Sequence, residues 1–97
     1  MIDGARSSSH RVSVLIADGD ALTRRRVRLM LETQPDFDVV GEADQVELAL
    51  DLARVLRPDL LLLGAHLPSM ASHDFAAAWK AELPNTRLVL LTDETLP

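Results

Sequence analysis

The sequence predicts an open, doubly wound α/β fold built on a parallel sheet. Short apolar runs begin near residues 12, 37, 59 and 86. Between these runs the spacing of apolar residues changes from a strand-like to a helical period. The intervals are too long for hairpin turns and suit crossover helices, which are right-handed in nearly all cases. The expected order is therefore β-α-β-α-β-α-β.

Four runs are expected to form strands. They are nearly continuous in apolar residues, which is typical of strands buried on both faces of a parallel sheet. The expected strands are Val12–Ala17, Phe37–Ala43, Leu60–Leu63 and Leu88–Leu91.

Three helices are expected between the strands, each with one apolar stripe. The first helix is expected to end before Pro35. The second helix is expected to have Asp44 as its N-cap and to stop at Pro58. The third is expected to follow Ser72, a possible cap, and to end at Pro84. The expected stripes are Leu22, Val27, Met30 and Leu31 in the first helix, Val46, Ala49, Leu50, Ala53 and Leu56 in the second, and Phe75, Ala78, Trp79 and Leu83 in the third.

The composition indicates one small domain in a chain of 97 residues. Residues 1–10, rich in serine, are expected to be a disordered lead-in, and 11–97 the domain. A net charge of −5 argues against nucleic-acid binding, and the absence of cysteine removes disulfides and thiol chemistry. Without an apolar run of membrane length or a signal peptide, we expect a cytoplasmic protein.

A ligand site in such a sheet is expected where the carboxyl ends of neighbouring strands meet. Asp18 and Asp20 follow the first strand, Gly64 the third and Thr92 the fourth. The two carboxylates could hold Mg²⁺ weakly. A competing interpretation, which we favour, is a strand-to-helix turn in which Asp20 caps the helix. Gly64 has no side chain for covalent chemistry.

Several local motifs make the chain resemble the receiver domain of two-component response regulators of the LuxR/NarL type. The motifs are VLIAD (Val14–Asp18), QPDFDVVGEA (Gln34–Ala43), RPDLLLL (Arg57–Leu63), LP-x-M (Leu67–Met70) and ELPNTRLVLLT (Glu82–Thr92). The resemblance implies a flavodoxin-like (CheY-like) doubly wound parallel sheet of order 2-1-3-4-5. It also implies an acidic pair that binds Mg²⁺, a phospho-accepting aspartate, a switch hydroxyl and a lysine.

Position by position, this sequence keeps part of that set. Asp18 matches the first acidic position, but Gly19 occupies the second, and Asp20 follows one residue later. Gly64 stands at the phospho-acceptor position and Thr92 at the switch position. The family lysine and the fifth βα unit have no counterpart, so the sheet order is expected to be 2-1-3-4 in a degenerate, C-terminally truncated receiver.

Other polar residues could also make contacts at or near this site. His66, two residues after Gly64, could point toward the same place. The first helix is also expected to carry a solvated basic face that could contact an acidic partner, formed by Arg24, Arg25, Arg26 and Arg28.

The favoured function is a pseudo-receiver of a response or transcription regulator that acts without phosphorylation, by homodimerising or by contacting a protein. Association is expected through the fourth strand, which would be a sheet edge. The alternatives are a small-molecule-gated receiver, in which missing side chains at 19 and 64 leave space for a ligand, and a fragment of a DNA-binding regulator. Since no nucleophile with a base and no dinucleotide motif is present, we expect no enzymatic activity.

Overall fold

A four-stranded parallel sheet forms the centre of the molecule. The computed structural model describes residues 11–64, 66–67 and 72–91, with the backbone alone for 72–76. The elements are β1 (Val12–Ala17), α2 (Ala21–Glu32), β2 (Phe37–Ala43), α3 (Val46–Leu56), β3 (Leu60–Leu63), α4 (Ser72–Glu82) and β4 (Arg87–Leu90). The expected strands and helices are confirmed, except that β4 (Arg87–Leu90) begins and ends one residue earlier than the expected Leu88–Leu91. The lead-in 1–10 and Thr92 lie outside the described residues.

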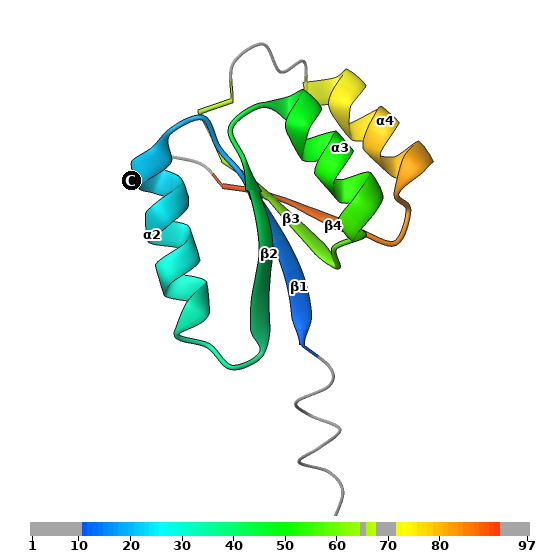
Figure 1. The fold of residues 1–97 in the computed structure, drawn as a ribbon. Helices are drawn as coiled ribbons and strands as arrows, with labels where there is room; N and C mark the ends of the chain where they lie inside the picture. Colours follow the sequence, from blue (N-terminus) through cyan, green and yellow to red (C-terminus); the bar gives the residue numbers. More distant parts are fainter. Residues whose placement is uncertain (1–10, 65, 68–71, 92–97) are drawn as a thin grey trace, which may run out of the picture.

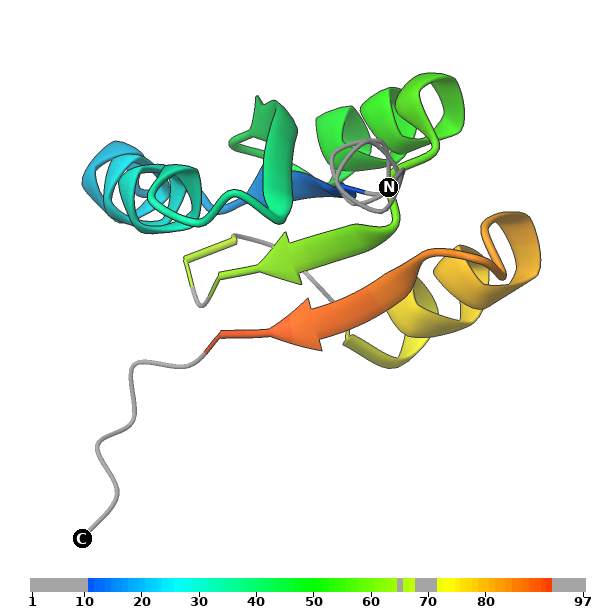
Figure 2. The ribbon, with the colours of Figure 1, turned by 90° about the horizontal axis from the view of Figure 1, so that it is seen from below.

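The strand order is β2-β1-β3-β4, as expected, with all neighbours parallel. Helix α2 covers one face of the sheet and helices α3 and α4 cover the other (Figures 1 and 2). In β2 the register with β1 shifts once, because Val14 pairs with Val39 and Leu15 with Gly41. Val40 is therefore a bulge residue on the outer strand of the sheet.

Alternating residues of the strands divide the core between the two faces. On the α3 and α4 side, Leu15 and Leu61 pack with Ala53 and Trp79. On the α2 side the buried core consists of Val14, Ile16, Val27 and Leu62. Between helices α3 and α4, Arg54 donates two hydrogen bonds to Glu82, and these bonds hold the pKa of the Glu82 carboxyl below its ordinary value.

Three details differ from the expectations. The stripe of α2 is only partly right: Val27 is buried, but Leu22 and Met30 are more than half exposed, because they lie on the flank of α2 turned away from the sheet. Asp44 is not the N-cap of α3; Gln45 occupies that position with extended backbone and no side-chain cap bond.

The third difference concerns β4, which is not buried on both faces. Val89 is 37% and Leu90 60% exposed, because β4, like β2, is an edge strand of the described sheet. No described helix is long and apolar enough to cross a membrane.

Candidate functional site: the carboxyl ends of β1 and β3

The expected site residues lie where β1 and β3 end side by side. The Gly64 N–H donates to the Ala17 carbonyl at 2.7 Å, which joins the ends of the two strands. The Gly19 N–H donates to the His66 carbonyl at 2.8 Å and joins the two loops that follow. The prediction that this edge of the sheet brings Asp18 and Gly64 together is confirmed.

The side chain of Asp18 fills the space that a side chain at position 64 would need. A Cβ added to Gly64 would lie 1.6 Å from Asp18 Oδ2 and 2.4 Å from its Cγ. No described glycine has a positive φ, so glycine is required at 64 for this close approach and not for its backbone angles. The expectation that the missing side chain leaves room for a ligand at position 64 is therefore wrong.

The Asp18 carboxylate is buried and held from two directions. Its Oδ1 accepts a hydrogen bond from the Asp20 N–H at 2.7 Å. The His66 Nδ1 lies 3.2 Å from Oδ1 and 3.3 Å from Oδ2, on a ring that is 40% exposed. With a proton on Nδ1, the ring donates a hydrogen bond to this carboxylate. The expectation that His66 points toward this place is confirmed.

The side chain of Asp20 points toward helix α2. Its Oδ2 accepts hydrogen bonds from the Thr23 N–H at 3.1 Å and the Thr23 hydroxyl at 2.6 Å, so it caps the helix. The Thr23 hydrogen bonds hold the pKa of Asp20 below its ordinary value of 3.8. The favoured turn-and-cap interpretation of Asp20 is confirmed.

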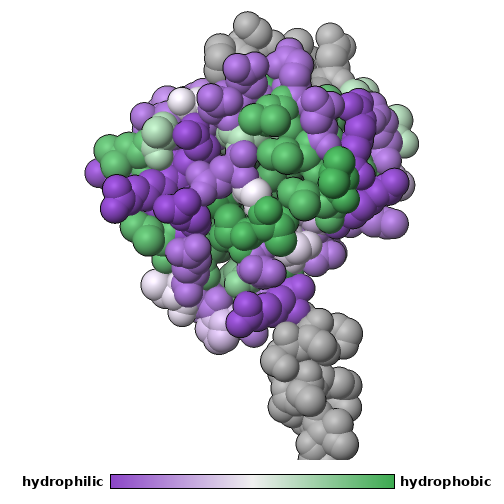
Figure 3. Space-filling model, viewed as in Figure 1, coloured by the Kyte–Doolittle hydropathy of each residue, from purple (hydrophilic) through white to green (hydrophobic). Residues whose placement is uncertain are grey.

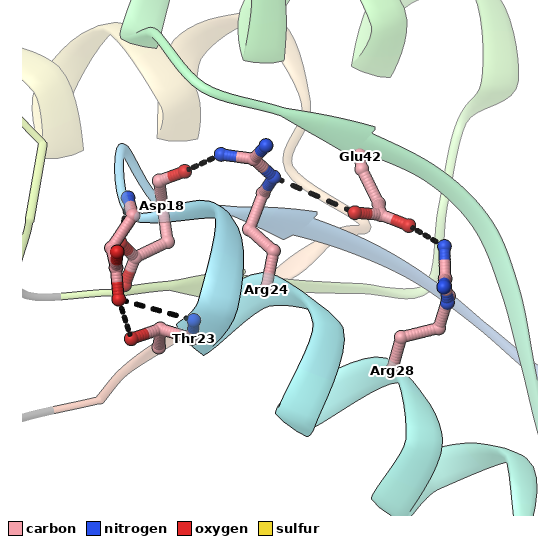
Figure 4. A network of polar contacts seen from close by, with 6 residues as sticks. Asp18, Thr23, Arg24, Arg28 and Glu42 are labelled. Carbon is pink, nitrogen blue, oxygen red and sulfur yellow. Dashed lines mark hydrogen bonds and ion pairs between the residues drawn. The ribbon is translucent and has the colours of Figure 1, made fainter.

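Two arginines tie the site to the outer strand, as Figure 4 shows. Arg24 donates to the Asp18 carbonyl and lies 3.5 Å from the Glu42 carboxylate, and Arg28 donates to Glu42 at 2.6 Å. These arginines were expected on a solvated face, and this expectation is wrong for Arg24 and Arg28, which are paired with Glu42. The sequence pattern that could have predicted these ion pairs is the i, i+4 spacing of Arg24 and Arg28 together with a glutamate near the end of an adjacent strand.

The donors that the structure describes at this edge do not fit Mg²⁺. The ion requires near-octahedral oxygen ligands, whereas Asp18 is directed over Gly64 and Asp20 is engaged by Thr23. Positions 19 and 64 supply no side-chain oxygen. Among the residues that the structure describes, no group of three histidine or acidic side chains is placed to hold a metal ion.

The sheet order and the site at the ends of β1 and β3 define a receiver-type signalling domain of the flavodoxin-like class. A family model described as "Response regulator receiver domain" matches residues 14–96. The chain belongs to this family, whose members serve two-component signal transduction.

Curated relatives include the response regulator protein VraR of Staphylococcus saprophyticus, 35% identical over 81 residues, which cover 84% of this chain and 39% of the relative. A protein-glutamate methylesterase/protein-glutamine glutaminase of Anaeromyxobacter dehalogenans is 32% identical over 87% of this chain and 25% of its own length. The chain thus spans about two fifths or less of these relatives.

Solved structures show the same fold. The signal receiver domain of the response regulator NarL from Mycobacterium tuberculosis superimposes with a TM-score of 0.79 and 35% identity, over 91% of this chain and 71% of that one. The receiver domain of RcsB from Salmonella enterica, solved with phosphomimetic BeF3⁻, gives a TM-score of 0.78 at 21% identity, which supports the fold alone.

Proposed function

We propose that this chain is a pseudo-receiver: a regulatory module of a cytoplasmic response or transcription regulator that acts by protein contact, without phosphorylation at position 64. The observation that carries the proposal is the pair formed by Gly64 and Asp18. The family's acceptor position has no nucleophile, and the space of the absent side chain is filled by a neighbouring carboxylate.

The contacts of Asp18 support the same proposal. A carboxylate that already accepts from the Asp20 N–H and lies against His66 is less available to a metal ion or a phosphodonor than a free one. Its burial, 1% exposed as a residue, also limits the access of a phosphodonor. We therefore propose no Mg²⁺-dependent phosphoryl transfer and no enzymatic activity for this domain.

Intact-mass spectrometry after incubation with Mg²⁺ and a small phosphodonor tests the proposal. The expected result is an unchanged mass, while a family receiver that retains its acceptor aspartate gains one phosphoryl group, about 80 Da, under the same conditions. A stoichiometric adduct on this chain would contradict the proposal. Peptide mapping would then show whether Asp18, Asp20 or His66 carries it.

We also propose that any DNA binding belongs to another part of a regulator and not to this domain. The net charge of −5 is unfavourable for contact with phosphates. The match covers only 39% of the length of the relative VraR, which supports the assignment of DNA binding to other segments. Titration of a DNA duplex with the chain at low salt should give no binding, and a salt-dependent complex would contradict this proposal.

A further inference from the structure

The outward side of helix α2 combines apolar and basic residues. Leu22, Leu29 and Met30 are between 49% and 62% exposed, and Arg25 and Arg26 beside them are exposed as well. Leu22, Arg26, Leu29 and Met30 follow the spacing i, i+4, i+7, i+8, which places them on one side of the helix. These residues together with Arg25 are called the α2 surface below.

Helix α3 carries a second apolar stripe with the same spacing. Leu48, Leu52, Val55 and Leu56 follow i, i+4, i+7, i+8. Leu48, Val55 and Leu56 are exposed, Val55 to 80%, whereas Leu52 also packs against the core. Figure 3 shows an apolar patch over α3 and the adjoining part of β2. The exposed side chains of Glu47 and Asp51 border the stripe. The stripe and these two carboxylates are called the α3 surface below.

The charges of the two surfaces are opposite. Helix α2 contains four of the ten basic residues of the chain and one of its fifteen acidic residues. Arg24 and Arg28 are bound to Glu42, whereas Arg25 and Arg26 form no ion pair with any described residue. The α3 surface contributes carboxylates at its border, of which Asp51 is shared with Arg54. Opposite charges beside matching apolar stripes favour contact between the two surfaces.

The two surfaces cannot meet within one molecule, because α2 and α3 lie on opposite faces of the sheet (Figures 1 and 2). We propose that the α2 surface of one copy of this chain binds the α3 surface of a second copy, head to tail. The inference rests on the proposed function, since a module without an aspartyl phosphate must signal through contacts. A contact of this kind has no two-fold axis, so it continues into a chain or closes into a ring.

Charge favours this pairing over a symmetric one. Two α3 surfaces facing each other would bring Glu47 and Asp51 of one copy toward the same carboxylates of the other. Two α2 surfaces facing each other would bring Arg25 and Arg26 of one copy toward the same arginines of the other, and like charges repel each other. The edge of β4 is a third surface with exposed apolar residues, Val89 and Leu90, and serves as the control in the test.

The test compares the mass in solution of the 97-residue chain and of three variants, by light scattering after size exclusion over a range of concentrations. The unchanged chain should exceed the monomer mass of 10.7 kDa, and its mass should rise with concentration beyond that of a dimer. Val55→Glu and Leu29→Glu should each be monomeric, because either change buries a charge at the contact. Leu90→Lys, the matched control at β4, should assemble like the unchanged chain.

Mixing the two monomeric variants distinguishes head-to-tail contact from every symmetric arrangement. The Val55→Glu chain retains an intact α2 surface and the Leu29→Glu chain an intact α3 surface, so their mixture should form a one-to-one pair and nothing larger. Circular dichroism and the emission of Trp79 confirm that each variant is folded. Added salt should weaken the pair, since the charges lie at the border of the contact.

Several results would overturn the inference: a monomer at all concentrations, no pair in the mixture, or assembly lost in Leu90→Lys but kept in Val55→Glu. Assembly lost in Val55→Glu and kept in Leu29→Glu would indicate a symmetric contact through α3. Each of these results leaves the proposed function standing, because only a phosphoryl adduct contradicts that function.

Discussion

Asp18 lies directly over the Cα of Gly64, so closely that its Oδ2 would be 1.6 Å from a Cβ at that position. The two residues come from neighbouring strands and are adjacent in space because β1 pairs with β3. One residue supplies the carboxylate and the other supplies the space for it. A substitution at either Asp18 or Gly64 should therefore also disturb the other residue.

Gly64→Ala should destabilise the domain, although an alanine usually stabilises a chain by reducing the entropy of the unfolded state. The new Cβ displaces the Asp18 carboxylate and removes the acceptor of the Asp20 N–H. Hydrogen bonds to charged groups contribute about 1.5–3 kcal/mol, so we expect a net loss of about 1–2 kcal/mol in urea unfolding.

Gly41→Ala is the matched control for Gly64→Ala. A Cβ at 41 would meet the ends of two leucine side chains at 3.1 Å, and these can move slightly. Its effect on unfolding should be clearly smaller. An equal or larger loss for Gly41→Ala would contradict the special role of the contact between Asp18 and residue 64.

Mg²⁺ should stabilise Gly64→Asp but not the unchanged chain. An aspartate at 64 places a second carboxylate against Asp18, and a divalent cation offsets the repulsion between them. In thermal unfolding with and without MgCl₂, the variant's midpoint should rise with the ion by mass action. A comparable rise for the unchanged chain would show that its own donors bind Mg²⁺.

Thr23→Ala should reduce the dependence of stability on acidic pH. The pKa of Asp20 is below its ordinary value of 3.8, chiefly because the Thr23 hydroxyl donates to the carboxylate. A lowered folded-state pKa adds stability above the ordinary value, and this stability is lost as pH falls through the folded-state pKa. The variant should thus differ from the unchanged chain at neutral pH and converge with it in acid. Thr23→Ser, which keeps the hydroxyl, should follow the unchanged chain.

Glu42→Gln should loosen the attachment of α2 to β2. The Glu42 carboxylate binds both Arg24 and Arg28, and the Arg24 and Glu42 side chains are mostly buried. We expect a loss of about 1 kcal/mol in unfolding free energy, with faster amide exchange in residues 19–24. Glu32→Gln, an exposed glutamate without an ion pair among the described residues, should change stability by less than about 0.5 kcal/mol.

Arg57→Gly should stabilise the domain. Arg57 ends α3 in the left-handed region, with φ 48° and ψ 59°, and it is the one described non-glycine residue with positive φ. Glycine adopts this conformation without the steric cost, which is about 1 kcal/mol for other residues. Arg57→Ala keeps the cost and should give no such gain. Equal stability of the two variants would show that the backbone angle is not the cause.

The fold could be predicted because it depends on patterns that are local in the sequence. The apolar runs and their spacing gave the strands, and Pro58 and Pro84 marked helix ends correctly. Errors arose in details that depend on packing. Gln45 rather than Asp44 is the N-cap of α3. In the predicted stripe of α2, Val27 and Leu31 pack on the core, whereas Leu22 and Met30 are exposed.

The candidate site was predicted in position but not in arrangement. Strand order brings Asp18 and Gly64 together, but the direction of the Asp18 side chain depends on contacts with Asp20 and His66 that form only after folding. Arg24 and Glu42 were missed for the same reason, since their contact joins residues 18 positions apart.

The bulge at Val40 also changes what the outer edge of β2 offers to a foreign strand. Strand β2 is an outer strand, and a regular outer strand offers a continuous row of backbone donors and acceptors to foreign strands. Because Val39 and Gly41 pair with consecutive residues of β1, the row is interrupted at Val40. A foreign strand in regular register can match β2 on one side of Val40 only, so this edge is a poor template for amyloid growth.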